Sequence, residues 1–251
     1  MYLNCLLQTI KVLSGCCRNI YIRCVFCPRM DDQISVNAIK KVSKEFDEDY
    51  YERGPDSGKS LYSNYKWLPE LTIPMAFNLI ETLHIGRDRK VLDFGCAKGF
   101  LVKAFRLLSR EAYGVDVSRY CIDQTHPDVK EYCKHSDGID IPFDHSFDWT
   151  IAKDVLEHVP YESIDAVVKK IISKTNNLFI VVPLGSDGKY VVPAYELDVT
   201  HHVREPIGWW ANLLERHGGK VTCAEYSFPG VKENWKDHKE GNGFLIAKKA
   251  E

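Results

Sequence analysis

The segment VLDFGCAKGF, residues 91–100, joins an apolar run to a helix-like stretch through a glycine-rich turn. Glycines let the backbone turn tightly and approach a ligand, and the N-terminus of a helix offers unpaired N–H groups to a carboxylate or phosphate. The spacing is G-x-A-x-G. It lacks the G-x-G-x-x-G of dinucleotide binders and the G-K-[ST] ending of a P-loop. The segment therefore predicts a ligand-binding turn between a strand and a helix.

Strand-like and helix-like segments alternate after this turn, which is typical of a parallel sheet covered on both faces. Residues 101–108 and 164–171 place apolar side chains at i, i+3, i+4 and i+7, so each predicts an amphipathic helix. Pro206 suits the first turn of another helix, whose buried stripe includes Trp210. We predict strands at 90–95, 111–117, 131–135, 147–153, 177–183, 220–227 and 243–248.

An acid also ends the second predicted strand. Asp116 follows Asp93 by 23 residues, at the end of AYGVD (112–116). In an open parallel sheet, ligands bind outside the carboxyl ends of the strands, where such an acid can accept hydrogen bonds from the hydroxyls of an adenosine ribose. Gly95 and Asp116 are therefore expected to converge on one ligand. The alternative is that Asp116 is an ordinary loop acid.

Four successive motifs resemble those of class I S-adenosylmethionine-dependent methyltransferases. They are DFGCAKG (93–99), GVDVS (114–118), the SDG, IPF and SFD triplets within 136–148, and DVLEHV (154–159). A further stretch, 182–201, resembles a subgroup linked to glycan and cell-surface polysaccharide biosynthesis. Together with similarity at residues 50–65, the resemblance covers about residues 45–248.

The resemblance implies an α/β, Rossmann-like fold. Its sheet would have seven mainly parallel strands in the order 3-2-1-4-5-7-6, with helices on both faces and an N-terminal helical cap. We predict three parts: a basic, cysteine-rich and poorly ordered extension at 1–30, the cap at 31–84 and the methyltransferase domain at 85–251.

It also implies S-adenosylmethionine as cofactor and S-adenosylhomocysteine as product. The glycine-rich turn would surround the methionine part and Asp116 the ribose. Asp137, with the backbone of Gly138, would face the adenine, and Lys153 and Asp154 would border the reactive centre. The predicted cofactor-binding residues are Asp93, Gly95, Cys96, Ala97, Gly99, Asp116, Val117, Asp137, Gly138, Lys153 and Asp154.

An alcohol acceptor must lose a proton as it is methylated, and histidine is a suitable base. We predict His201 as this base, oriented by Asp198 and Thr200, with Asp154 as the second catalytic candidate. The alternatives are that these residues only fix their loop and that His158 only holds the segment after the fourth strand. The residues predicted to bind the acceptor are Tyr190, Tyr195, Glu196, Asp198, His202, Arg204 and Trp209.

The predicted reaction is therefore O-methylation of a sugar hydroxyl on a glycan or nucleotide-linked sugar. Three alternatives are open: methylation of a phenol or quinone precursor, a non-catalytic cofactor-binding scaffold, and a nicotinamide dehydrogenase, which the missing G-x-G-x-x-G disfavours. Oxygen and nitrogen ligands for a divalent cation are available at Asp154, Asp198, His201 and His202, but their spacing is not that of a tight site and no metal site is predicted.

Composition excludes a function based on bulk charge. The 251 residues carry a formal net charge of -2, so no overall cationic field attracts nucleic acid, and none is predicted as a partner. No run of 18 apolar residues occurs, so no transmembrane segment is predicted. An odd total of nine cysteines, spread along the chain, favours reduced thiols and a cytoplasmic location. The oligomeric state is not indicated.

The first 30 residues differ from the rest. They carry four basic residues and no acid, and five of the nine cysteines. Several interpretations compete: a metal site at Cys16, Cys17, Cys24 and Cys27, a lipoprotein-like box ending at Cys16, an interfacial or targeting helix, and an extension upstream of a working start at Met30. We expect a poorly ordered tail.

Overall fold

The computed structural model describes residues 37–235 and 237–250. The predictions for the extension at 1–30, its cysteines included, lie outside the described residues.

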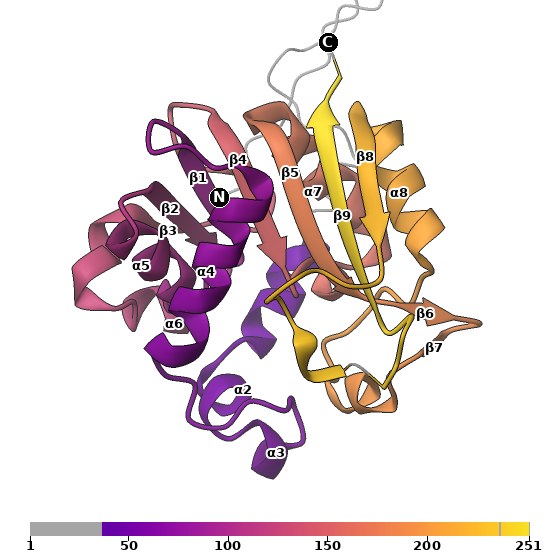
Figure 1. Ribbon diagram of the computed structural model, residues 1–251. Helices are drawn as coiled ribbons and strands as arrows, with labels where there is room; N and C mark the ends of the chain where they lie inside the picture. Colours follow the sequence, from indigo (N-terminus) through magenta and orange to yellow (C-terminus); the bar gives the residue numbers. More distant parts are fainter. Residues whose placement is uncertain (1–36, 236, 251) are drawn as a thin grey trace, which may run out of the picture.

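A seven-stranded sheet organises the chain, in the order β3-β2-β1-β4-β5-β9-β8. The predicted order is confirmed, because β8 and β9 are the sixth and seventh predicted strands. β9 runs antiparallel to both of its neighbours, whereas the pairings among β3, β2, β1, β4 and β5 are all parallel (Figure 1). The strands are β1 (Lys90–Phe94), β2 (Glu111–Asp116), β3 (Cys133–His135), β4 (Phe147–Lys153), β5 (Thr175–Pro183), β8 (Gly219–Glu225) and β9 (Asn242–Lys249).

The central strands are apolar on both faces, as a covered sheet requires. In β5, every residue from Leu178 to Pro183 is buried. The third strand is shorter than predicted, because a 3-10 helix, η2 (Pro127–Tyr132), takes up its first residues. The proline at its start suits a helical first turn and cannot donate a hydrogen bond to a strand.

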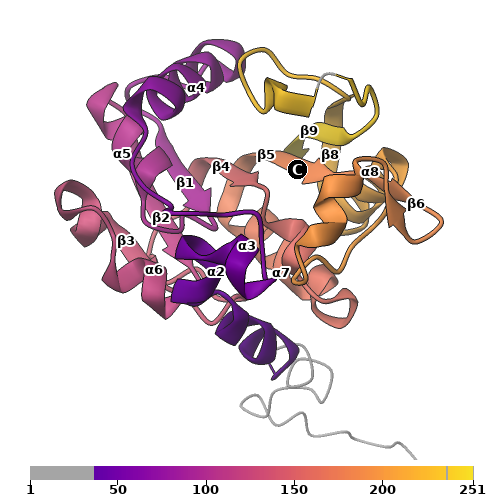
Figure 2. The same ribbon diagram turned by 90° about the horizontal axis from the view of Figure 1, so that it is seen from below.

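Helices cover both faces of the sheet. On one face α4 (Pro69–Leu83) packs beside α5 (Phe100–Leu107), and on the other face lie α7 (Tyr161–Lys174) and α8 (Ile207–Arg216) (Figures 1 and 2). Each layer buries its own apolar core, with Phe105 in the first and Trp210 in the second. The predicted helical stripes therefore face the sheet.

The N-terminal segment crosses the edge where the parallel strands end (Figure 2). It consists of a helical stretch at 37–42 and then η1 (Ser43–Glu45), α2 (Glu48–Glu52) and α3 (Gly54–Ser57). Hydrogen bonds attach it to the sheet side: Ser118 Oγ donates to the Phe46 carbonyl at 2.6 Å, and the Lys98 ammonium bonds the Glu52 carboxylate at 2.5 Å. We call residues 37–66 the cap segment. It places side chains over the carboxyl ends of β1 and β2.

The remaining short elements lie in the connections. They are α6 (Arg119–Asp123), η3 (Leu156–His158), the hairpin of β6 (Gly185–Ser186) and β7 (Lys189–Tyr190), η4 (Pro193–Leu197) and η5 (Glu233–Trp235). Among the described residues, no helix has the length and apolar character needed to cross a membrane.

Candidate functional site

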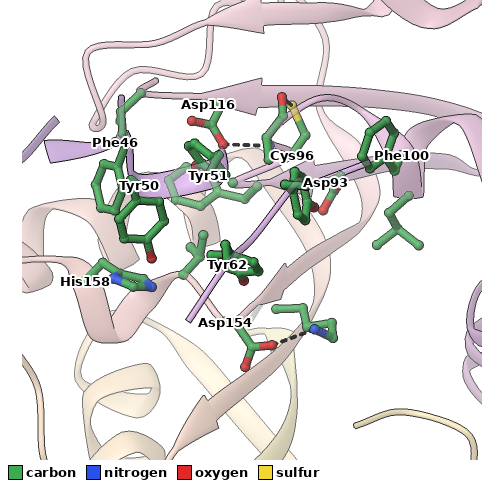
Figure 3. A pocket seen from close by; sticks show the side chains of 18 of the residues that line it. Phe46, Tyr50, Tyr51, Tyr62, Asp93, Cys96, Phe100, Asp116, Asp154 and His158 are labelled. Atoms are coloured by element: carbon green, nitrogen blue, oxygen red, sulfur yellow. Dashed lines mark hydrogen bonds and ion pairs between the residues drawn. The ribbon is translucent and has the colours of Figure 1, made fainter. Parts of the chain in front are cut away.

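A cavity of about 500 Å³ lies between the cap segment and the carboxyl ends of β1, β2 and β4. This volume is within the range of small-molecule and cofactor sites. Figure 3 shows acids from three strand ends, Asp93, Asp116 and Asp154, together with rings of the cap segment. The cavity lies where an open parallel sheet binds its ligands.

The glycine-rich turn forms one wall of the cavity. The backbone N–H groups of Gly95 and Cys96 both donate to the Val115 carbonyl, at 2.8 and 3.0 Å, so the turn is fixed to the end of β2. Gly95 has φ +83°, and a Cβ there would lie 1.9 Å from Val155 Cγ2. Ala97 also has a positive φ, +46°, which is unfavourable for a residue with a side chain. The turn therefore holds a strained conformation at the cavity.

Asp116 ties the same turn to the start of α6. Its Oδ2 accepts a hydrogen bond from the Ala97 N–H and its Oδ1 one from the Ser118 N–H, each at 2.7 Å. Burial raises the pKa of the Asp116 carboxyl to about 6, against these hydrogen bonds, which lower it. Each carboxylate oxygen has a second lone pair, so Asp116 can still accept hydrogen bonds from a ligand.

Asp93 lies one residue before the end of β1, near Asp116. Its side chain is buried, and burial together with repulsion by Asp116 raises the pKa of its carboxyl to about 7, while Lys153 acts in the opposite direction. Two buried acids of raised pKa mark a place where a positively charged ligand would relieve repulsion.

The structure brings most of the predicted cofactor-binding residues to this cavity. Gly99 and Asp137 do not line it. Gly99 is the N-cap of α5, and Asp137 is exposed, with its Oδ1 accepting hydrogen bonds from the backbone N–H groups of Ile139 and Asp140. The predicted residues that line the cavity are Asp93, Gly95, Cys96, Ala97, Asp116, Val117, Gly138, Lys153 and Asp154.

The cap segment supplies a wall of aromatic rings. Tyr51 stacks on Tyr62 with ring centroids 6.0 Å apart, and Tyr50 meets Tyr51 edge-on at 4.9 Å. Phe46 lines the cavity as well and contacts Tyr50 edge-on. The aromatic composition of residues 46–65 was the sequence signal for this wall. The pattern did not indicate which rings turn inward.

Asp154 lies at the other end of the cavity, just past β4. Its φ is +54°, and its carboxylate bonds the ammonium groups of Lys153, at 2.5 Å, and Lys232. These two cations hold the pKa of the Asp154 carboxyl well below its usual range, although burial opposes them. Asp154 is therefore a permanent anion and a weak base. Lys232, from the loop between β8 and β9, had no sequence signal.

His158 belongs to η3 and lines the cavity. In Figure 3 its ring points toward the space between Tyr62 and Asp154. Its Nδ1 lies 2.7 Å from Thr200 Oγ1, and the Thr200 hydroxyl donates to Asp198 Oδ1 at 2.6 Å. Since that hydroxyl proton is used, Nδ1 must carry the hydrogen and Nε2 is left with a lone pair. Burial and the nearby His201 lower the pKa of His158 to about 3.

His201 lies behind His158 rather than in the cavity lining. The two rings are 4.6 Å apart, and His201 Nδ1 lies 2.9 Å from the Tyr195 carbonyl oxygen. Burial lowers the pKa of His201 as well. Glu157 is beside them and only 1% exposed, and burial with repulsion by Asp154 raises the pKa of its carboxyl to about 8.

Several of the residues predicted to bind the acceptor are held by hydrogen bonds and ion pairs within the protein. Arg204 forms an ion pair with Glu196 at 3.0 Å. The Tyr190 hydroxyl donates to the Val203 carbonyl at 2.9 Å, and the Tyr195 hydroxyl donates to Asn242 at 2.7 Å. None of the seven predicted residues lines the cavity: Tyr190, Tyr195, Glu196, Asp198, His202, Arg204 and Trp209.

Comparisons with known proteins agree with the geometry. The family described as "Methyltransferase domain" matches residues 74–227, more than half of the chain. No curated protein matches the sequence.

Solved structures resemble the fold. A putative methyltransferase in complex with the Trm112 methyltransferase activator of Haloferax volcanii gives a TM-score of 0.60 at 13% identity, over 84% of this chain and 98% of that chain. Magnesium protoporphyrin IX methyltransferase from Synechocystis, with bound SAH, gives 0.53 at 15% identity, over 72% and 83%. A SAM-dependent methyltransferase from Archaeoglobus fulgidus gives 0.52 at 20% identity, over 69% and 92%. At these identities the likeness establishes the fold.

Proposed function

The chain belongs to the methyltransferase domain family and is an S-adenosylmethionine-dependent methyltransferase, and we propose that it methylates a hydroxyl oxygen of a small, ring-shaped acceptor. The position of His158 is the observation that supports a hydroxyl acceptor. Its neutral imidazole lines the cavity and is fixed by Thr200 with the Nε2 lone pair free. A hydroxyl acceptor needs such a base.

The charges of the cavity support the placement of the cofactor. S-adenosylmethionine supplies a methyl group made electrophilic by a sulfonium, so the protein has to align the acceptor and exclude water. Three acids of the lining, Asp93, Asp116 and Asp154, outnumber its two lysines, Lys66 and Lys153, which suits a ligand with cationic ammonium and sulfonium groups. In our proposal Asp116 accepts the ribose hydroxyls, the turn at Gly95 and Ala97 holds the methionine end, and Val117 and Gly138 flank the adenine.

The proton of the acceptor hydroxyl passes to His158 in this proposal. His201 was the base predicted from the sequence, but His158 stands between it and the cavity. His201 would then act on His158 through ring contact and charge. Asp154 is held in ion pairs by two lysines, so its carboxylate is suited to position a group rather than to accept a proton.

The proposal also names the chemical class of the acceptor. A sugar is supported by the resemblance of residues 182–201, yet several polar groups of that segment are already held by hydrogen bonds within the protein. An aromatic alcohol is supported by the lining, in which Leu61, Leu71 and Met75 join the tyrosine rings. We therefore place a phenol-type acceptor ahead of a sugar, because apolar walls do not compensate the desolvation of several sugar hydroxyls.

Calorimetry tests the cofactor site. S-adenosylhomocysteine should bind the wild-type protein, and Asp116→Asn should weaken binding about 10- to 100-fold, because it removes a charged acceptor worth about 1.5–3 kcal/mol. Asp187→Asn is the matched control, since Asp187 is exposed in the β6–β7 hairpin. Absent binding, or equal binding in both variants, would refute the assignment.

An acceptor screen tests the chemistry. Methyl transfer should occur to hydroxylated aromatic compounds, and His158→Gln should lower kcat by about 100-fold or more while cofactor binding persists. Sugars and nucleotide-linked sugars form the second panel, with mass spectrometry of surface glycans from cells with and without the gene. Transfer only to sugars would overturn the preference for a phenol. Full kcat in His158→Gln would exclude His158 as the base.

A further inference from the structure

We propose that Glu157, His158 and His201 form a binding site for a divalent transition-metal ion beside the cavity. One ligand atom from each of the three side chains lies within 4.8 Å of the other two. The residues come from η3 and from the loop after η4. That loop is bonded to η3, because the backbone N–H groups of His202 and Val203 both donate to the Glu157 carbonyl, at 2.8 and 3.1 Å.

Both imidazoles present a lone pair rather than a hydrogen. His201 Nδ1 faces the Tyr195 carbonyl, which can only accept, so the ring hydrogen of His201 is on Nδ1. His158 Nδ1 faces the Thr200 hydroxyl, whose own hydrogen goes to Asp198. The Nε2 atoms are therefore free to ligate. Metal-bound histidines show this arrangement, with the second ring nitrogen donating to a carbonyl or another polar partner.

The buried carboxylate of Glu157 supports the metal site independently of the two imidazoles. Its side chain is 1% exposed, and Oε2 has no hydrogen-bond partner among the described residues. A buried carboxylate oxygen left unpaired is costly, and here its near neighbours are two imidazoles whose free nitrogens are acceptors as well. When Glu157 is ionised, neither imidazole offers its Oε2 a hydrogen-bond donor. A cation satisfies all three acceptors together.

The ligand set favours a transition metal over Mg²⁺ or Ca²⁺. Two imidazoles and one carboxylate suit zinc, iron, cobalt or manganese, whereas the harder cations prefer oxygen ligands throughout. Asp154 is not part of the set, because its carboxylate is held by Lys153 and Lys232. Three protein ligands leave coordination positions for water or a ligand, and His158 borders the cavity. If the proposed function holds, an acceptor hydroxyl could occupy such a position, and the ion would then acidify it in place of His158, whose Nε2 would be a ligand.

A cobalt titration tests the metal site without cofactor or acceptor, so its result does not depend on the proposed function. The full-length protein is freed of metal with a chelator and titrated with Co²⁺. We expect visible d–d absorption typical of nitrogen and oxygen ligands and an increase in thermal stability with metal concentration. Cobalt bound by the cysteines of residues 1–30 would instead show thiolate charge-transfer bands in the near ultraviolet.

Variants locate the binding. Glu157→Gln and His201→Ala should abolish the visible bands, and Thr200→Val should weaken binding about 10- to 100-fold by releasing the His158 ring. His217→Ala is the matched control and should bind like the wild type, because His217 pairs with Asp165 at 2.6 Å outside the cluster. Circular dichroism verifies that each variant is folded.

Two results would overturn the proposal. One is a wild-type protein that shows only thiolate bands or no cobalt binding, and this result needs no variant. The other is cobalt binding of equal affinity in the wild type and folded Glu157→Gln. In either case the buried Glu157 would be satisfied by a proton shared with an imidazole.

Discussion

Replacing Tyr50 by phenylalanine removes one oxygen that joins the cap segment to the rest of the fold. The Tyr50 hydroxyl donates to Asp198 Oδ2 at 2.7 Å, across 148 residues of sequence, and both side chains are buried. Asp198 Oδ1 keeps its hydrogen bonds from Thr200. The substitution therefore deletes a single hydrogen bond to a carboxylate and leaves the ring packing in place.

A hydrogen bond to a charged group contributes about 1.5–3 kcal/mol, and here the carboxylate oxygen loses its partner in a buried place. We expect Tyr50→Phe to lower the free energy of unfolding by about 2 kcal/mol. For a domain of this size that corresponds to a decrease in Tm of about 4–8 °C. Urea unfolding, followed by circular dichroism, measures the free-energy difference, and an unchanged m value shows that only stability changed.

Tyr161→Phe provides the matched control. The Tyr161 hydroxyl also donates to a carboxylate, that of Glu205 at 2.9 Å, but Tyr161 is 46% exposed. Water replaces that partner, so the loss should stay within about 0.5 kcal/mol. If Tyr50→Phe lowers the free energy of unfolding no more than Tyr161→Phe does, the Tyr50–Asp198 hydrogen bond does not hold the cap segment. A double-mutant cycle with Asp198→Asn should show a coupling energy above about 0.5 kcal/mol.

Three further predictions concern the cavity. Gly95→Ala should destabilise the protein about 1–3 kcal/mol more than Gly188→Ala in urea unfolding. Both glycines have a positive φ, but only a Cβ at Gly95 meets a neighbour, Val155. Equal losses of stability would show that the Val155 side chain moves aside without cost. Cofactor affinity should fall as the pH decreases from 8 to 5.5, since Asp93 and Asp116, with pKa values of about 7 and about 6, lose the charge that attracts a cationic ligand. Calorimetry at the two pH values measures the affinity, and a constant affinity would contradict the prediction. His158 has a folded-state pKa of about 3, below the ordinary 6.5, so its contribution to stability is complete above pH 6.5 and is lost as the pH falls toward 3. His158→Gln should therefore reduce the pH slope of the unfolding free energy in this window, by up to about 1.4 kcal/mol per pH unit, and an unchanged slope would indicate an already protonated imidazole.

The strands and helices could be predicted because the sequence patterns that indicate them are local. The apolar run and turn at 91–100, the acid that ends β2 and the amphipathic stretch at 164–171 each depend on neighbours within a few residues. Once each strand and helix is placed, the right-handed crossover rule and the family motifs leave few sheet orders. The predicted strand positions accordingly lie within two residues of the observed ends at nearly every boundary.

The acceptor side of the site was less predictable, because polar residues of one loop can bond one another or a ligand. Glu196 and Arg204 suggested a grip on a sugar, but their ion pair and the bond from Glu196 to the Tyr190 N–H fix the loop itself. Conversely, Lys232 reaches Asp154 across 78 residues of sequence. No spacing rule connects two such positions.

Local sequence pattern was enough to predict the strands, the glycine-rich turn and the acids near the ends of β1 and β2, since these follow from hydrophobic periodicity and local backbone requirements. The family resemblance implied the order of the strands. Only the tertiary structure decided which imidazole lines the cavity, that Asp154 is neutralised by two lysines, and that Glu157 is buried among His158 and His201. The physical reason is that charge state and lone-pair direction depend on burial and on partners from distant segments. These properties exist only after the chain has packed.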